Sequence, residues 1–437
     1  NRPWLTLRIF SGLALCKGTF ASFRIFSEGF MVKVVLFLLG VLLSGCLWES
    51  PNFQELDYLP LDDTEFPYAG LPRLVIETKD FKEIRNRETE HEAFFQIYGK
   101  EKAETEILKL KIRGRGHSSF LFPKFSYRLK FEEKISLFGM PENKDWILLS
   151  NFADKSMLKN KLTFCLAKKL NAPYVPRSEF VELYVNREYL GVYQLTEKIE
   201  VAKNRVNIPE RSGAFLIEID NKYSRKDSVL FTPFFDIPLH IHEGEHSLLK
   251  DKKALKDFVG EFESYLLNEM SYSEKELSKW LDLESYFRVY WIQEFSRNVD
   301  GFLNSAYFTW VSNTPMQFGP VWDFDIAYGG AHEINPEGWY TRNYSWNKEL
   351  FSDVDFQKKA NHYWIENKNI FAEILDSLSF WELELKEPAK NNFKRWPVLE
   401  STESWAHRES FHSYLEAVES LRNWLRIRIK WINKNLS

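Results

Sequence analysis

Two aspartates, one residue apart, interrupt an otherwise apolar stretch, VWDFDIAYGG, at residues 321–330. On a β-strand, Asp323 and Asp325 would point to the same face. Two carboxylates on one face attract a divalent cation such as Mg²⁺, which prefers hard oxygen ligands. The same pattern fits a solvated strand edge, with the aromatic and aliphatic side chains inward and a turn at the closing glycines. The stretch alone leaves both interpretations open.

Two earlier stretches could bind phosphate. In IRGRGHSS, the glycines allow close backbone approach, and Arg115 with the hydroxyls of Ser118 and Ser119 could bind phosphate oxygens, although a hairpin turn has the same composition. In the predicted strand SYRLKFEE, Arg128 and Lys130 project from one face. They could neutralise phosphates or form a plain solvated face.

A fourth group lies in RNVDGFLN, where Asp300 is followed by Asn304. A carboxylate followed by an amide can hold a hydroxyl nucleophile and a metal, although Asn and Asp are also common in turns. The four groups follow one another as a glycine-rich turn, a basic strand, an Asp–Asn loop and an Asp before Gly. This order resembles the logic of protein kinases, in which positioning and charge neutralisation drive catalysis, although the standard kinase strings are missing.

The elements that must position these residues change character along the chain. Period-two patterns predict strands, and helical apolar spacing dominates after about residue 250. The predicted strands are 71–79, 93–99, 107–116, 126–133, 145–151, a hairpin over 179–197, and 213–220; the predicted helices are 155–170, 251–270, 283–298 and most of 350–437. We therefore expect an α+β fold with two lobes, a strand-rich N-lobe (71–228) and a helix-rich C-lobe (229–437).

The composition sets further limits. The chain has 437 residues, of which 44% are hydrophobic and 16% aromatic, enough for a large core. The net charge of −4 gives no sign of a general nucleic-acid binder, so we expect no nucleic-acid partner.

The N-terminal part predicts export. Residues 31–46 form a short charged start, an apolar run and the sequence Leu-Ser-Gly-Cys, which resembles a bacterial lipoprotein signal peptide with Cys46 as the lipidated residue. Residues 1–30 are then a gene-model extension, and residues 47–70 a tether between anchor and fold. An ordinary signal peptide, or a buried strand with an incidental cysteine, is the alternative. Cys165 is predicted to be a small core residue.

Five ordered blocks resemble the spore coat protein H (CotH) kinase family. They are IRGRGHSSFLFPKFSYRLKF, DWILLSNFADKSMLKNKL, VELYVNREYLGVYQLTEKIE, NVDGFLNSAYFTW and GPVWDFDIAYGG, and the terminal WLRIRIKWINKNL resembles that family's closing helix. The resemblance spans about residues 108–437. It implies an atypical protein-kinase-like fold that uses ATP with Mg²⁺ or Mn²⁺.

The resemblance also implies roles for individual residues. Asp300 matches the catalytic aspartate of the family's Asn-x-Asp loop, and Asp323 matches its metal-binding aspartate. Asn304 would be a second metal ligand, with Asp325 in support. Arg128 or Lys130 would face the phosphates. The helix predicted at 155–170 contains no Glu, so it cannot supply the usual Lys–Glu pair of protein kinases.

Together these observations predict an exported, lipid-anchored kinase of the bacterial cell envelope. Its substrates would be Ser and Thr residues of envelope or coat proteins, and its membrane contact would be the lipid on Cys46. Because little ATP is present outside the cell, a non-catalytic surface binding or assembly protein is the alternative. A third hypothesis is a glycosidase in which Asp300 and Asp323 are the two carboxylates on opposite sides of the scissile bond.

Overall fold

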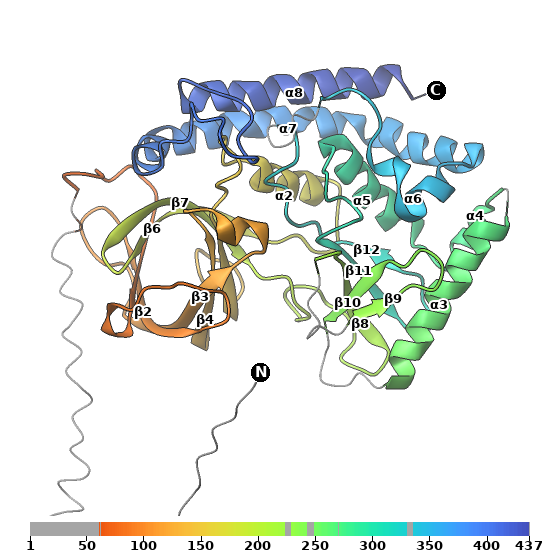
Figure 1. The fold of residues 1–437 in the computed structure, drawn as a ribbon, viewed down its shortest axis with the longest axis horizontal. Helices are drawn as coiled ribbons and strands as arrows, with labels where there is room; N and C mark the ends of the chain where they lie inside the picture. The colour runs from red at the N-terminus through yellow and green to blue at the C-terminus, as the bar shows by residue number, and fades with distance from the viewer. Residues whose placement is uncertain are drawn as a thin grey trace, which may run out of the picture. The chain divides into compact units, whose positions relative to one another are not determined.

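Seven strands in the first part of the chain close into a β-barrel (Figure 1). The computed structural model describes residues 61, 63–222, 229–242, 249–269, 271–329 and 335–436. The predicted gene-model extension, the signal peptide with Cys46 and most of the tether lie outside the described residues. Cys165 is described, and it packs half-buried against the main core.

The helices and strands have the following bounds: β1 Arg73–Thr78, η1 Lys79–Phe81, β2 His91–Tyr98, β3 Leu108–Arg115, η2 Ser118–Leu121, β4 Ser126–Ile135, β5 Asn143–Leu149, α2 Lys159–Lys169, β6 Ser178–Val185, β7 Glu188–Glu197, β8 Ala214–Ile219, β9 Val229–Phe231, β10 Pro238–His242, α3 Leu249–Asn268, α4 Glu274–Leu277, α5 Leu283–Ser296, β11 Ala306–Val311, β12 Gln317–Phe318, η4 Thr341–Asn343, α6 Ser345–Leu350, α7 Val354–Arg395 and α8 Tyr414–Lys434.

The barrel follows the strand order β1–β2–β3–β4–β5–β7–β6, and it closes through a parallel pairing of β1 with β6. Its strands alternate as their sequences predict. In β3, Leu110 and Ile112 are buried inside the barrel while Lys109 and Lys111 face outward. Because closure removes the free edges of a sheet, the barrel forms a rigid platform for the turn that follows β3.

A second sheet of five strands and a set of helices make up the rest of the described chain. The sheet order is β12–β11–β8–β10–β9. The long helices α7 and α8 pack on each other, and α7 also contacts β7 and α2 (Figure 1). The α+β class is therefore confirmed. The predicted boundary at residue 228 falls inside the second sheet, because β8 before it pairs with β10 and β11 after it.

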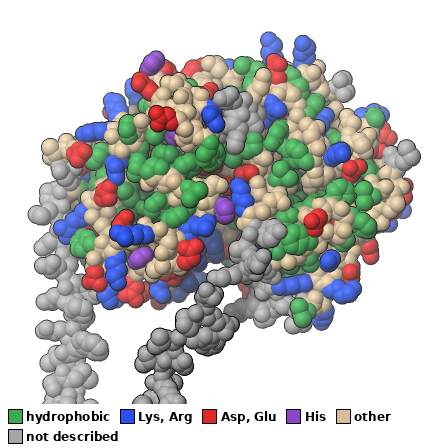
Figure 2. Space-filling view, in the orientation of Figure 1, with side chains coloured by type: hydrophobic (Ala, Val, Ile, Leu, Met, Phe, Trp, Pro, Cys, Tyr) green, Lys and Arg blue, Asp and Glu red, His purple; other side chains and the backbone are tan. Residues whose placement is uncertain are grey.

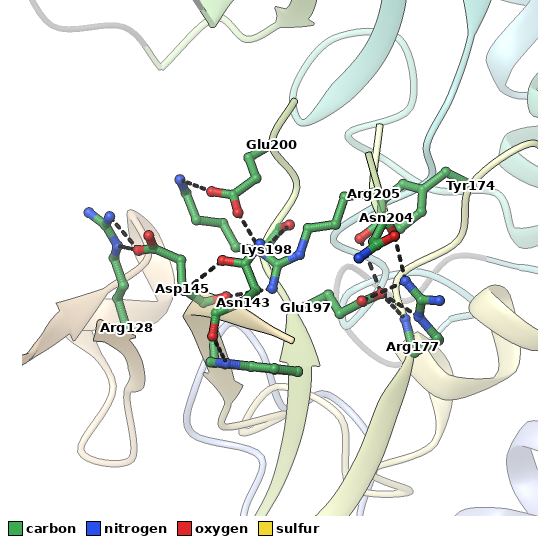
Figure 3. Close-up of polar contacts among 11 residues, drawn as sticks. Arg128, Asn143, Asp145, Tyr174, Arg177, Glu197, Lys198, Glu200, Asn204 and Arg205 are labelled. Carbon is green, nitrogen blue, oxygen red and sulfur yellow. Dashed lines mark hydrogen bonds and ion pairs between the residues drawn. The ribbon is translucent and has the colours of Figure 1, made fainter. Parts of the chain in front are cut away.

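A buried polar network fixes the chain where it leaves the barrel (Figure 3). Glu197, the last residue of β7, is fully buried and accepts hydrogen bonds from Arg177 Nε at 2.9 Å and Nη2 at 2.7 Å. Arg205 lies a few residues further on and donates to the carbonyl of Asp145 at 2.7 Å and to Glu200 Oε1 at 2.8 Å. Paired in this way, the buried charges tie the exit segment to β5 of the barrel.

A buried lysine joins the barrel to α7. Lys124 Nζ donates to the carbonyl of Val192 at 2.6 Å and to Asn392 Oδ1 at 2.9 Å. Burial lowers the pKa of Lys124 to about 7 from its ordinary 10.5. Between these two values the unfolded chain binds more protons than the folded protein, so the free energy of unfolding should rise with pH across this window.

A Lys124→Met variant should lose this contribution. We expect the free energy of unfolding of the wild type, relative to that of the variant, to increase as the pH rises from about 7 towards 10.5. Urea unfolding of both proteins at several pH values measures this difference. Parallel pH curves would show that Lys124 is protonated in the folded protein.

The surface visible in Figure 2 carries acidic and basic side chains interspersed with hydrophobic ones. Within the part of the chain that the structure describes, no helix combines the length and the apolar character needed to cross a membrane.

Candidate active site

Residues from several distant chain segments line one cavity of about 400 Å³. A cavity of this size suits a small-molecule ligand such as a nucleotide. The barrel contributes the turn after β3, and the second sheet contributes the end of β8. The loop before β11 contributes Asp300, the segment after β12 contributes Asp323 and Asp325, and the α7–α8 loop contributes Trp405.

Asp323 and Asp325 both point into this cavity, but they do not lie on a strand. The segment after β12 is irregular, and residues 325–326 form a turn, so the strand considered for this stretch is not formed over its described residues 321–329. Asp323 has a left-handed backbone conformation with φ of 66°, which a β-strand cannot contain. Such a conformation costs about 1–3 kcal/mol and persists only where the surroundings enforce it.

The pKa values of Asp323 and Asp325 are both raised by burial and by neighbouring carboxylates. Burial and the negative charge of Asp300 raise the pKa of Asp323, while Arg115 and Lys222 act in the opposite direction. Burial and the charge of Asp323 raise the pKa of Asp325. Nearby carboxylates raise one another's pKa because each disfavours the ionised form of the other. A bound cation would stabilise the ionised forms of both carboxylates.

Asp300 enters the cavity from the loop between α5 and β11. Its Oδ1 accepts a hydrogen bond from Asn304 Nδ2 at 2.6 Å, and its Oδ2 lies 3.6 Å from Lys222 Nζ. The side-chain oxygen of Asn304 accepts from the backbone N–H of Asn221 at 3.1 Å. Asn304 therefore orients Asp300 with its amide nitrogen, and it is not among the residues that line the cavity.

The glycine-rich turn after β3 forms the wall that the barrel contributes. Arg115, Ser118 and Ser119 all line the cavity, as their predicted contact with phosphate requires. The Arg115 guanidinium lies over the Trp322 ring, 4.9 Å from its centroid, a distance typical of a cation–π contact. Gly116 has φ of 103°, a conformation that favours glycine. The turn thus presents a cation and two hydroxyls opposite the carboxylates.

Arg128 and Lys130 are not among the residues that line the cavity, so the structure does not bring them to the predicted phosphate site. The alternation of β4 places both on the outer surface of the barrel, because Leu129 between them is buried inside. Arg128 Nε donates to Asp145 Oδ1 at 2.6 Å, a pair drawn in Figure 3. Lys130 is exposed. The sequence showed that these two residues share a face, but barrel closure decides where that face points.

Several lining residues had not been singled out from the sequence. Glu218 and Asp220 alternate at the end of β8 with the same spacing as Asp323 and Asp325, a signal that was available. Trp405 comes from the loop between α7 and α8 and stacks on Phe122, with ring centroids 5.4 Å apart. No local pattern could have placed Trp405 at the cavity, because its position depends on the packing of the last two helices.

The donor set of the cavity fits Mg²⁺ or Mn²⁺. Asp323 and Asp325 provide hard carboxylate oxygens on one side of the cavity, where their charges are only partly compensated. Among the described residues, no three His, Cys, Asp or Glu side chains are grouped to hold an ion by themselves. Mg²⁺ in phosphoryl-transfer sites is held by one or two carboxylates, with phosphate oxygens and water completing the shell. The cavity therefore fits an ion that arrives with a phosphate ligand.

Comparison with known proteins identifies the family of the chain. The family model described as CotH kinase protein matches residues 112–432. None of the curated proteins compared with the sequence matches it. The family match contains the glycine-rich turn, α2, the Asp300 loop and the Asp323–Asp325 segment, and it covers most of the chain. The chain therefore belongs to the CotH kinase protein family.

Proposed function

We propose that this protein is an atypical protein kinase that transfers the γ-phosphate of ATP to Ser or Thr hydroxyls, with Mg²⁺ or Mn²⁺ as the cofactor. The observation that carries the proposal is the meeting of Asp300, Asp323 and Asp325 with Arg115 in one nucleotide-sized cavity. Family membership adds support, since the family is described as a kinase.

Each residue has a distinct part in the proposed transfer. Asp323 and Asp325 would hold the cation, whose charge stabilises the phosphate oxygens as negative charge shifts during transfer. Arg115 and the hydroxyls of Ser118 and Ser119 would bind phosphate oxygens from the barrel side. Asp300 would orient the acceptor hydroxyl and accept its proton. The acceptor oxygen then bonds to the γ-phosphorus, the bond to the bridging oxygen breaks, and ADP leaves.

We further propose that the barrel and the helix-rich remainder act as the two halves of a kinase-like arrangement. In support, the glycine-rich turn comes from the barrel, whereas the three aspartates come from loops that follow α5 and β12. Helix α2 contains no acidic residue, so the pairing of a lysine with a helical Glu that many kinases use would be replaced by other contacts.

A nucleotide titration tests the proposal. A fluorescent ATP analogue should bind saturably in the presence of Mg²⁺, and EDTA should reverse the binding. If no nucleotide binds with Mg²⁺ or with Mn²⁺, the kinase proposal fails. The alternative, a surface binding or assembly protein that keeps the fold without turnover, would then take its place.

We also propose that the protein is exported and anchored in the bacterial cell envelope through lipid on Cys46, where envelope or coat proteins are its substrates. The support is the sequence of residues 31–46. A Cys46→Ser variant should move from the membrane fraction to the soluble fraction. If the variant stays in the detergent phase with unchanged mass, the anchor lies elsewhere.

A further inference from the structure

The segment that carries the two cavity carboxylates needs support from outside itself. Asp323 and Tyr328 both have left-handed backbone conformations, with φ of 66° and 56°. The segment pairs with no strand in the described sheets. Backbone bonds fix the later part: Ala327 N donates to Phe324 O at 3.1 Å within the segment, and Tyr328 N donates to the carbonyl of Ser296, the last residue of α5, at 2.8 Å. The peptide between the two carboxylates has to be held by another element.

Asn160, in the first turn of α2, holds that peptide. Its Oδ1 accepts a hydrogen bond from the backbone N–H of Phe324 at 2.8 Å. Phe324 lies between Asp323 and Asp325, so this bond fixes the backbone from which both carboxylates project. Asn160 is 2% exposed, so water does not reach this hydrogen bond. Its loss would leave a buried N–H donor without a partner, which is destabilising.

A chain of buried amides orients Asn160 from the barrel side. Asn160 Nδ2 donates to Asn151 Oδ1 at 3.0 Å, and Asn151 Nδ2 donates to Gln194 Oε1 at 3.1 Å. Gln194, in β7, donates in turn to Ser178 Oγ in β6 at 2.9 Å. Because each amide uses its nitrogen as donor towards the barrel, the Asn160 oxygen is left as the acceptor for the carboxylate segment.

Two further contacts join α2 to the same segment. Lys159 Nζ donates to the carbonyl of Gly329 at 3.0 Å. The hydroxyls of Thr163 and Tyr328 lie 2.8 Å apart. With Asn160, these contacts attach one face of α2 along the segment from Phe324 to Gly329. These contacts attach the segment to α2, while the Tyr328 N–H attaches its end to α5.

We propose that Asn160 is a positioning residue that sets the cation-binding geometry of Asp323 and Asp325 by holding the Phe324 peptide against α2. The role assigned to the carboxylates rests on the proposed function. On this proposal α2 acts on the cation site through an amide, whereas the helical glutamate of many kinases pairs with a lysine that contacts the nucleotide.

An Asn160→Ala variant tests this role, with Asn391→Ala as the matched control. Asn391 is also a buried asparagine, 6% exposed, and its Nδ2 donates to Pro67 O at 2.7 Å and to Glu182 Oε1 at 3.2 Å, away from the cavity. Both variants should lose some thermal stability, because each leaves buried polar groups unpaired.

Only the first variant should change the metal dependence. We expect the Mg²⁺ concentration that half-saturates binding of a fluorescent ATP analogue to rise about tenfold or more for Asn160→Ala, as is usual when a residue that orients metal ligands is lost. The control should keep the wild-type value. A folded Asn160→Ala protein with wild-type Mg²⁺ dependence would overturn the proposal.

Hydrogen exchange of the protein without ligands separates this inference from the proposed function. Peptides covering residues 321–329 should exchange faster in Asn160→Ala than in the wild type and in Asn391→Ala. Unchanged exchange would overturn the positioning role even if nucleotide binds. If the wild type binds no Mg²⁺–nucleotide, the proposed function fails, while exchange still decides whether Asn160 holds the segment.

Discussion

An Asp300→Asn variant is expected to lose phosphoryl transfer by a factor of about 10²–10⁴ while binding nucleotide as the wild type does. Asp300 is proposed to take the proton of the acceptor hydroxyl, and an amide cannot do so. The substitution keeps size and polarity, and the oxygen of Asn at this position can still accept from Asn304 Nδ2, which lies 2.6 Å from Asp300 Oδ1. The fold should therefore survive.

The measurement is label transfer under saturating Mg²⁺ and ATP, alongside nucleotide affinity. Asp355→Asn is a suitable control, because Asp355 is an exposed carboxylate in the first turn of α7 and does not line the cavity. If Asp300→Asn transfers label at the wild-type rate, Asp300 is not the catalytic base. If the variant instead loses nucleotide affinity, Asp300 acts in binding.

An Asp323→Ala variant is expected to lose Mg²⁺-dependent nucleotide binding altogether. Alanine supplies no oxygen ligand, so Asp325 alone would have to hold the cation. Thermal stability should stay close to that of the wild type, because removing a carboxylate that burial and the charge of Asp300 disfavour offsets the poorer fit of Ala to the left-handed backbone at this position. This combination separates loss of a ligand from loss of fold.

Titration of a fluorescent ATP analogue with Mg²⁺ and with EDTA, together with a melting curve, tests this second prediction. Tight nucleotide binding by the variant that is indifferent to EDTA would remove the cation-binding role of Asp323. A large fall in melting temperature would show that Asp323 supports the fold instead.

The barrel shows what the sequence could predict. Alternation in the fourth strand correctly put Tyr127, Leu129 and Phe131 on one face and Arg128 and Lys130 on the other. Local alternation cannot say which face looks into a binding site, because that depends on how seven strands close. Arg128 and Lys130 were predicted to face phosphates, but they do not line the cavity.

The segment of residues 321–329, which carries Asp323 and Asp325, shows where local sequence patterns mislead. The sequence singled out Asp323 and Asp325 as candidate cation ligands, and both line the cavity, but their spacing also suggested a strand that is not formed over residues 321–329. Asp323 has a left-handed conformation, and the next peptide is bonded to Asn160 of α2, about 160 positions earlier in the chain. Such long-range contacts leave no periodic signal in the segment itself.

Helix α2 illustrates a boundary error with a functional consequence. The helix was predicted to begin at about residue 155, whereas α2 begins at Lys159. Asp154 Oδ1 accepts from Ser156 N at 2.9 Å and its Oδ2 from Lys159 N at 2.9 Å, so it stabilises a turn that precedes the helix as well as the helix start. This turn places Asn160 in the first turn of α2, beside the carboxylate segment.

Transfer of the γ-phosphate from radiolabelled ATP to Ser or Thr tests the proposed kinase activity itself. The purified protein would be incubated with Mg²⁺, with Mn²⁺ and with EDTA, in the presence of a generic acidic acceptor protein, and label would be followed on the acceptor and on the protein itself. We expect metal-dependent incorporation on Ser or Thr that EDTA abolishes and that Asp300→Asn lowers by about 10²–10⁴-fold. Absence of label with either metal, in a folded protein that also binds no nucleotide, would contradict it.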